Sequence, residues 1–405
     1  MEEPTIKKEK KKNVVILVVD AFRPKNLSLF GYDKKTDENL FKIANEGFVF
    51  KDYFSSSNST TPALVSIFTG LYPKNHGIMH QLPYTKQEEI DKFFQNNCFW
   101  LPEFLREKGY TTIAIDWLGL WFKKGFDYYG DGMSFEEAKK APFNSAENLA
   151  EMAISKVSES KNPFFLFVHF WDTHFPFPHT NYEEKSGTEL AIEQIEGENQ
   201  KEYFRKRMKG NLSFTFEDLV GKYDSSIKRV DKQIGKICDF LKEKNLWDDT
   251  IFIVLGDHGT NLTEHKTYFS SSGLYDNSIN TFLYMHLPEK GTKRIRGFVQ
   301  DIDILPTILE NLELEIPKNI DGKTIMPLIK KGIPVREHIF SFDGLCEDIV
   351  CVRDFKKKLI VAKNNHCYLC KGKHHEEIEE YEIGEDPGEK KDIYSGESEL
   401  KKFLD

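Results

Sequence analysis

The sequence lacks several features that define whole classes of protein. No stretch approaches the roughly 20 consecutive apolar residues that a membrane-spanning helix needs. The six cysteines are scattered rather than spaced as a secreted disulfide framework, and no internal repeat is present. The net charge of −9 disfavours a nucleic-acid-binding surface, because phosphate contacts need clustered lysine and arginine. We therefore expect neither a membrane span nor a nucleic-acid partner.

The N-terminus also lacks the pattern of a secretory signal peptide. Residues 1–12 form a short basic leader, which we interpret as a solvated tail. The charged start passes into only six apolar residues before Asp20, where a signal peptide would carry a longer apolar region. Together with the scattered cysteines, this start predicts a cytoplasmic protein.

The apolar pattern predicts an α/β fold. Three continuous apolar runs, Val14–Val19, Phe164–Val168 and Ile251–Leu255, are typical of strands buried on both faces of a parallel sheet. Between Val220 and Leu241 apolar residues recur every three or four positions, which indicates an amphipathic helix. Hydrophobic residues make up 39% of the 405 residues, enough for one substantial core. We expect a doubly wound, mostly parallel sheet flanked by helices.

The same patterns divide the chain into a large and a small part. Residues 13–318 alternate strands with helices and are expected to form the catalytic α/β domain. Residues 319–405 read as short strands and turns, which predicts a small C-terminal α+β subdomain with an antiparallel sheet. The polar insert from Glu183 to Asn211 lacks strong periodicity, and we expect it to lie over the rim of the active site.

Two of the predicted strands end in acidic residues. Asp20 follows the first strand, and Asp257-His258 follows the third, with a glycine on either side of the pair. Open α/β sheets bind ligands at the carboxyl ends of their strands. Carboxylate and imidazole groups at that edge suit a divalent metal ion.

A hydroxyl residue precedes an apolar helical pattern at Thr60. The polar cluster Ser55–Thr61 leads directly into this pattern, so Ser59 or Thr60 can cap the helix. A helix N-terminus favours negative charge, and a nucleophilic oxygen there can attack a phosphorus or sulfur centre. An ordinary N-cap is the alternative interpretation of Thr60 alone, but the two acid-bearing strands make a reactive site the better one.

These residues resemble the sulfatase family within the alkaline phosphatase superfamily. Sulfatases carry a Cys-x-Pro-Ser-Arg motif with Thr-Gly nine residues after the cysteine, and Thr60, Pro62, Thr69 and Gly70 fall in that frame. Other family-like segments occur in order along the chain: Asn39-Leu40, Glu46-Gly47, Tyr72–Gly77, His169–Phe177, Gly256–Gly259, Glu264-His265, Leu274–Asp276, Asp303–Thr307 and Asp386–Glu389. The resemblance implies a hydrolase of anionic esters.

The sequence departs from the sulfatase pattern at the reactive positions. Sulfatases oxidise the motif cysteine to formylglycine, which Thr60 cannot become by that route. The motif serine and arginine are Ala63 and Leu64, and the second aspartate at the first strand is Ala21. The lysine expected four residues before Tyr275 falls on Ser271.

The departures resemble a neighbouring branch of the superfamily. Its phosphodiesterases, phosphomutases and phosphotransferases use a metal-coordinated threonine as nucleophile, and Asp20, Thr60, Asp257 and His258 match that metal-ligand set. The resemblance implies one divalent ion, which lowers the pKa of the threonine hydroxyl. A histidine ligand favours Zn²⁺ or Mn²⁺, whereas Ca²⁺ or Mg²⁺ remain alternatives.

The other histidines have different expected roles. By resemblance, His174 contacts the anion or protonates the leaving group, and His265 assists it. His169 is interpreted as a satisfied core histidine, and His76 as holding the turn after the nucleophile helix. Because only one residue separates Asp172 from His174, a second metal is not expected.

A Cys367-x-x-Cys370 motif followed by His374-His375 invites a zinc interpretation. However, it lies between two predicted strands of the C-terminal sheet, lysines surround it, and no second CxxC exists. A plain exposed hairpin is therefore the favoured interpretation.

The sequence as a whole predicts a metal-dependent hydrolase that forms a covalent Thr60 intermediate on a small anionic ester. A phosphoester hydrolase or phosphotransferase is favoured. The alternatives are a sulfuric ester hydrolase and, from a different class, an inactive sulfatase-like binding protein.

Overall fold

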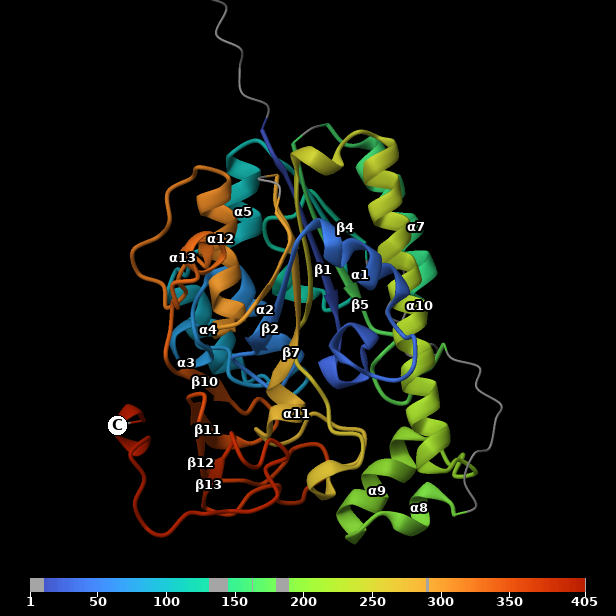
Figure 1. The fold of residues 1–405 in the computed structure, drawn as a ribbon, viewed down its shortest axis with the longest axis vertical. Helices are drawn as coiled ribbons and strands as arrows, with labels where there is room; N and C mark the ends of the chain where they lie inside the picture. Colours follow the sequence, from blue (N-terminus) through green and yellow to red (C-terminus); the bar gives the residue numbers. More distant parts are fainter. Residues whose placement is uncertain (1–10, 131–144, 162, 180–188, 289–290, 405) are drawn as a thin grey trace, which may run out of the picture.

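The computed structural model of the chain describes residues 11–130, 145–161, 163–179, 189–288 and 291–404. Residues 1–10 of the predicted basic leader and residues 183–188 of the polar insert lie outside this range. The described residues form a large helix-flanked sheet with a smaller sheet at one end (Figure 1). Among the described helices, none has the length and apolarity required to cross a lipid bilayer.

The large sheet has nine strands in the order β4-β3-β5-β1-β6-β7-β2-β8, with β9 paired to β2. Its strands are β1 Asn13–Val19, β2 Phe48–Phe54, β3 Thr111–Ile115, β4 Tyr128–Gly130, β5 Phe164–Phe170, β6 Thr250–Gly256, β7 Asn280–His286, β8 Lys293–Ile295 and β9 Val299–Gln300. Strand β1 pairs in parallel with both β5 and β6, whereas β7 is antiparallel to its two neighbours. The predicted mostly parallel sheet is confirmed.

Strand β1 shows why the sheet lies between two layers of helices. All seven of its residues are buried, and successive side chains of a strand point to opposite faces. Val15, Leu17 and Val19 belong to one core cluster, and Val14, Ile16 and Val18 to the other. Because each face must be covered, a continuous apolar run is needed instead of an alternating one.

Each core cluster is covered by its own helices (Figure 1). The helices on the first face are α1 Glu38–Ile43, α7 Ala146–Glu159 and α10 Phe216–Glu243, and those on the second are α2 Thr60–Thr69, α5 Leu101–Glu107, α12 Ile304–Asn311 and α13 Met326–Lys331. Shorter helices are α3 Pro73–His76, α4 Gln87–Gln95, α8 Ala191–Gln194, α9 Glu198–Arg207 and α11 Asp276–Ile279.

Helix α10 confirms the predicted amphipathic helix and extends it at both ends. It starts with a reciprocal cap in which Thr215 Oγ1 accepts from the Asp218 amide at 3.1 Å and Asp218 Oδ2 accepts from the Thr215 amide at 3.0 Å. The expected apolar positions from Tyr223 to Leu241 are buried against the sheet.

The small sheet consists of β10 Ile339–Phe342, β11 Glu347–Arg353, β12 Lys357–Asn364 and β13 Ile378–Glu382, all antiparallel and in chain order. It contacts the segment before α2: the Phe342 amide donates to the Ser56 carbonyl at 2.9 Å, and the Ser341 hydroxyl to the Ser55 carbonyl at 2.6 Å. Helix α13 packs on the large sheet, and the small sheet begins after it, at Ile339. Through its hydrogen bonds to Ser55 and Ser56, the small sheet supports the segment that leads to Thr60.

Candidate active site

Two strand ends bring their acidic residues together. Strands β1 and β6 are in parallel register with Val19 opposite Gly256, so Asp20 and Asp257 emerge at the same edge of the sheet. Asp257 Oδ1 accepts from the amides of Ala21 at 3.1 Å and His258 at 2.7 Å. Asp257 Oδ2 and Asp20 Oδ1 are buried and have no hydrogen-bond partner. Both free oxygens require a cation or a proton.

Thr60 is the first residue of α2 and lies between these groups. Its hydroxyl oxygen is 3.2 Å from Asp20 Oδ2 and 3.3 Å from His258 Nε2. His258 Nδ1 is 2.6 Å from the Gly259 carbonyl oxygen, so this nitrogen carries the proton and Nε2 presents a lone pair. The structure thus brings all four predicted metal ligands into one cluster.

The expected helix cap was wrong in detail. Ser59 occupies the N-cap position with extended backbone, but its side chain makes no capping hydrogen bond. Instead Gln81 Oε1 accepts from the Thr61 amide at 2.8 Å. The Thr60 hydroxyl is directed at Asp20 and His258 and is not used as a cap.

His169 is a candidate site residue that the sequence interpretation missed. It lies on β5 opposite Val18 of β1 and is fully buried. Its Nδ1 is 3.0 Å from Asp116 Oδ1, but its Nε2 has no partner, so the interpretation as a satisfied core histidine was wrong. The strand order would have identified His169, because β5 and β6 both border β1 and so bring their residues to the same place as Asp20.

A divalent cation fits this cluster. Ligand atoms of Asp20, His169 and Asp257 lie within 4.8 Å of one another, and each of the three residues has one buried polar atom without a hydrogen-bond partner. Burial, followed by the negative charge of the neighbouring Asp257, raises the pKa of Asp20 well above its usual value. Asp116 supports the histidine in the way that carboxylates support metal-ligating imidazoles.

Thr60 and His258 line a cavity of about 270 Å³. Its lining combines polar groups with aromatic and aliphatic ones: Ala21, Ser59, Thr60, Gln81, Leu82, Pro83, Tyr84, Trp117, Trp171, His174, Phe175, Tyr203, Arg207, His258, Thr260, Phe269, Ser270, Ser271, Leu345 and Leu369. Tyr203 and Arg207 come from α9, so the polar insert does contribute to the wall of the site. Within the described ranges, Arg207 is the one lysine or arginine in this lining.

Arg207 and His174 are in contact at the cavity wall. A guanidinium nitrogen of Arg207 lies 2.8 Å from His174 Nδ1 and also donates to the carbonyl oxygen of Phe175. Burial, followed by the charge of Arg207, lowers the pKa of His174 well below its usual value. The imidazole is therefore neutral at neutral pH and suited to hydrogen bonding with an anion.

Three other residues lie outside this cavity lining. His265 stacks on Tyr275 with ring centroids 3.6 Å apart and lines a different, open cavity, so its predicted role at the leaving group has no geometric support. Asp172 is paired with Arg229, whose Nε lies 3.3 Å from Oδ1, and burial raises the pKa of Asp172 to about 7. His76 bonds Ser66 at 3.1 Å and the Ile78 amide, in agreement with its predicted structural role.

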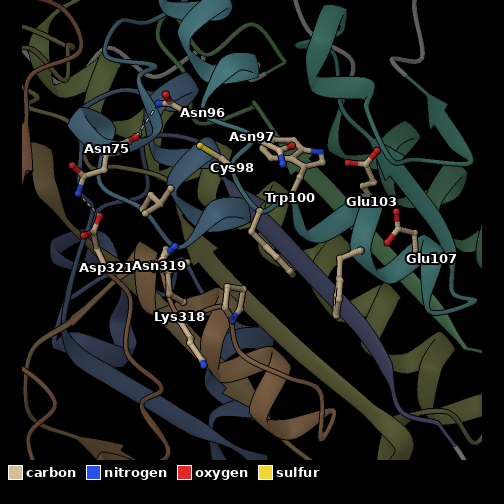
Figure 2. Close-up of a pocket in the computed structure, with 15 residues that line it drawn as sticks. Asn75, Asn96, Asn97, Cys98, Trp100, Glu103, Glu107, Lys318, Asn319 and Asp321 are labelled. Atoms are coloured by element: carbon tan, nitrogen blue, oxygen red, sulfur yellow. Dashed lines mark hydrogen bonds between the residues drawn. The ribbon is translucent and has the colours of Figure 1, made fainter.

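A second cavity, of about 910 Å³, lies beside α5 and the segment before α13 (Figure 2). Its polar lining consists of four asparagines and four charged residues, Glu103, Glu107, Lys318 and Asp321. No predicted catalytic or metal-binding residue is part of this described lining. The cavity next to Thr60 is therefore the better candidate, although it is smaller.

Comparisons with known proteins agree on one family, the sulfatases. The family model described as "Sulfatase" matches residues 12–314, and that of "N-sulphoglucosamine sulphohydrolase, C-terminal" matches residues 263–404. An ulvan-active sulfatase from Formosa agariphila is 24% identical across 82% of this chain, which spans only 57% of that relative's length. An arylsulfatase from Clostridium perfringens is 24% identical, covering 84% of this chain and 82% of its own.

A solved structure extends the similarity to the fold. The phosphonate monoester hydrolase of Agrobacterium radiobacter superposes with a TM-score of 0.69 at 18% sequence identity. The match covers 97% of this chain and 93% of the other. Both the large and the small sheet therefore belong to one shared architecture.

Proposed function

We propose that this chain, which belongs to the sulfatase family of the alkaline phosphatase superfamily, is a metal-dependent ester hydrolase. Its proposed nucleophile is Thr60. The favoured substrate is a small phosphoester, hydrolysed or transferred through a covalent phosphothreonine. This reaction requires a threonine hydroxyl that can lose its proton and a site for the negatively charged ester group.

The observation that carries the proposal is the position of the Thr60 hydroxyl. It has two possible acceptors, Asp20 Oδ2 at 3.2 Å and His258 Nε2 at 3.3 Å, but only one proton to donate. An ordinary buried threonine satisfies its hydroxyl with one backbone carbonyl. A hydroxyl held between a carboxylate and an imidazole lone pair is instead suited to deprotonation.

Asp20, Thr60, Asp257 and His258, with His169 as a further candidate ligand, would hold a divalent ion, which would supply positive charge that lowers the pKa of the Thr60 hydroxyl. Zn²⁺ or Mn²⁺ suits the imidazole ligands. Asp116 fixes the orientation of His169, and the amides of Ala21 and His258 fix Asp257.

The residues of the chain account for each step of the reaction. Thr60 Oγ1 transfers its proton to Asp20 Oδ2, 3.2 Å away, and attacks phosphorus. The bond from phosphorus to the leaving oxygen breaks, and the alkoxide takes a proton from water while Asp20 returns its proton to solvent. Arg207 balances the charge of the bound ester, and neutral His174 donates a hydrogen bond to it. Water then attacks the phosphothreonine, which releases phosphate and restores the Thr60 hydroxyl.

The aromatic residues of the cavity favour a substrate with a flat or ring-shaped leaving group. Trp117 and Trp171 meet edge to face with centroids 4.6 Å apart, and both line the cavity. Such rings provide apolar contact area while the polar groups orient the ester.

Two alternatives use the same residues. Sulfuric ester hydrolysis is the reaction named for the Clostridium relative, and a sulfate ester carries a similar anionic group. An inactive binding protein would keep the fold without turnover, but retention of the nucleophile and metal-ligand types argues against it. A cytoplasmic location stays a prediction.

A paired assay tests the proposal. The purified chain is incubated with aryl phosphate, aryl phosphodiester and aryl sulfate, with Mn²⁺, Zn²⁺, Mg²⁺ and Ca²⁺ added separately. We expect turnover of a phosphoester with Mn²⁺ or Zn²⁺ and its loss in Thr60→Ala. Turnover of aryl sulfate alone would replace the phosphoester assignment, and no turnover of any ester would favour a binding protein.

A further inference from the structure

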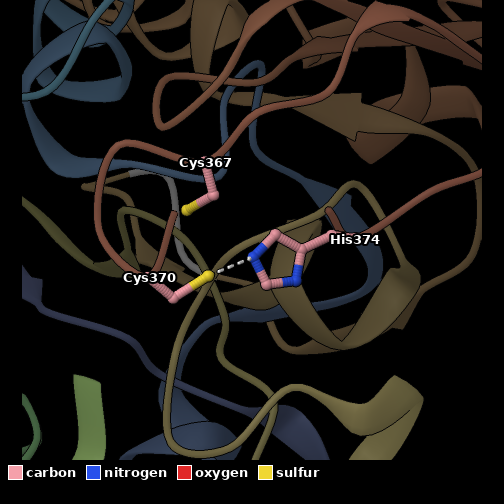
Figure 3. A group of neighbouring side chains, drawn as sticks. All are labelled: Cys367, Cys370 and His374. Atoms are coloured by element: carbon pink, nitrogen blue, oxygen red, sulfur yellow. Dashed lines mark hydrogen bonds between the residues drawn. The ribbon is translucent and has the colours of Figure 1, made fainter. Parts of the chain in front are cut away.

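A second cluster of metal-binding residue types lies in the loop between β12 and β13. Cys367, Cys370 and His374 have ligand atoms within 4.8 Å of one another, and all three side chains are buried (Figure 3). The sequence interpretation of this segment as a plain exposed hairpin was therefore wrong. Burial of two thiols and an imidazole at one point needs a physical reason, because polar groups are rarely brought together in a core without one.

A fourth donor comes from another loop. Cys346 lies between β10 and β11 and is 1% exposed. Its loop is joined to the loop of Cys367 by the Tyr368 amide, which donates to the Leu345 carbonyl oxygen at 2.8 Å. Three cysteines and one histidine are a donor set typical of closed, tetrahedral zinc sites. We propose that Cys346, Cys367, Cys370 and His374 bind one structural Zn²⁺, separate from the ion at Thr60.

The groups around the cluster orient these donors. His374 Nδ1 lies 3.1 Å from Thr267 Oγ1, which leaves Nε2 directed at Cys370 Sγ, 3.2 Å away. The Gly372 amide donates to Cys370 Sγ at 3.3 Å, and Gln200 Nε2 lies 3.6 Å from the same sulfur. Such donors stabilise thiolate ligands, and a partner on the second ring nitrogen fixes the imidazole tautomer.

The neighbouring histidine belongs to a different network. His375 Nδ1 is 2.8 Å from Glu379 Oε2, and its Nε2 accepts from the Leu274 amide at 2.9 Å. Both ring nitrogens are used, so the His-His pair of the sequence contributes one ligand. The proposed fourth ligand is Cys346, which lies 21 positions before Cys367 in the sequence.

The position of the zinc site gives it a role in shaping the active site. Leu345 and Leu369, adjacent to Cys346 and Cys370, both line the cavity next to Thr60. Helix α9, which carries Arg207, is connected to the same loop through Gln200 and through Asn199 Nδ2, 3.1 Å from the Lys371 carbonyl oxygen. A bound ion would therefore hold two loops and α9 in a fixed arrangement. This inference does not depend on the proposed reaction.

Cobalt substitution of the full chain is the first test. Cobalt bound by cysteine thiolates absorbs in the near ultraviolet, whereas the oxygen and nitrogen ligands around Thr60 do not produce this band. We expect the band in the unaltered protein and in Asp257→Asn, and its loss in Cys367→Ser and Cys370→Ser. Cys238→Ser, which removes a buried thiol of α10, is the matched control and should keep the band.

A second test needs no variant, so it remains decisive if the cysteine variants fail to fold. Zinc content is measured on the purified chain, and the thiols are then titrated with a mercurial in the presence of a zinc-sensitive dye. We expect release of about one zinc per chain. A disulfide between any two of Cys346, Cys367 and Cys370 in a non-reduced peptide map, or release of no zinc from the folded protein, would overturn the proposal.

Discussion

The hydroxyl oxygen of Thr60 lies 3.3 Å from Nε2 of His258, although 198 positions separate these residues in the chain. Thr60 is the first residue of α2, on one face of the large sheet, and His258 lies just after β6, a strand of that sheet. The contact forms because the end of β6 and the start of α2 meet beside Asp20. A reactive hydroxyl at such a junction has definite consequences for substitution, metal binding and pH.

Replacement of Thr60 by alanine should abolish turnover and leave the fold intact. Loss of a covalent nucleophile reduces kcat by up to about 10⁶-fold. The free energy of unfolding should change by only about 1 kcal/mol, the usual contribution of one hydrogen bond. Steady-state kinetics and thermal unfolding measure the two effects. Ser59→Ala and Thr61→Ala are the controls, and loss of activity in either one with retention in Thr60→Ala would contradict the assignment.

The peptide that contains Thr60 should be chemically unmodified. Threonine lacks the thiol that the formylglycine-generating oxidation in true sulfatases requires. Mass spectrometry of a protein digest should give the unmodified mass of this peptide, and an aldehyde-reactive probe should label no residue in it. An aldehyde at this position would refute a threonine nucleophile.

Asp116→Asn should weaken metal binding at the active site without removing a ligand. Asp116 Oδ1 lies 3.0 Å from His169 Nδ1, and loss of such a supporting carboxylate lowers metal affinity about 10- to 100-fold. Calorimetric titration of the metal-free protein with Zn²⁺ or Mn²⁺ measures the change. His169→Gln should weaken binding at least as much; unchanged affinity in His169→Gln would exclude this histidine as a ligand.

Arg207→Gln should impair substrate binding. Arg207 supplies positive charge to the cavity lining, so its removal should raise KM for an anionic ester by about tenfold or more, equivalent to the roughly 1.5–3 kcal/mol of a charged hydrogen bond. Arg205→Gln is a matched control on the same helix, because Arg205 is exposed and is paired with Glu198 at 3.8 Å. Equal KM values for the two variants would show that Arg207 does not contribute to substrate binding.

Stability should fall in acid because of Glu264. Burial alone would raise the pKa of this carboxyl, but the positive charge of Arg23, its two hydrogen bonds at 2.7 and 3.1 Å, and backbone amide donors outweigh burial and lower the pKa to about 2. A lowered folded-state pKa gives a contribution that is complete above pH 4.5, the unfolded value, and is lost as pH falls towards 2.

Chemical denaturation between pH 5 and about 2 tests this dependence. Glu264→Gln should show a shallower loss of stability over that interval than the unaltered chain. Glu198→Gln, at an exposed acid of α9, serves as the control. Parallel curves for Glu264→Gln and the unaltered chain would show that the pair does not contribute.

The sequence alone determined the elements whose signal is local. The runs Val14–Val19 and Ile251–Leu255 are apolar at every position, which is typical of short strands with both faces covered, and an acid follows each run within two residues. The periodicity between Val220 and Leu241 likewise admits one amphipathic helix. Thr60, Asp20, Asp257 and His258 followed from these local patterns together with the family resemblance.

Only the tertiary structure decided which distant residues complete the two metal clusters. His169 lies beside the first proposed cluster because β5 borders β1. Cys346 is a proposed member of the second because the Tyr368 amide of the β12–β13 loop donates to the Leu345 carbonyl oxygen of the β10–β11 loop. Arg207 reaches the cavity from α9, in a polar segment without a periodic pattern. Such contacts depend on strand order and loop packing, which link positions far apart in the chain, whereas composition and periodicity report only on neighbours along it.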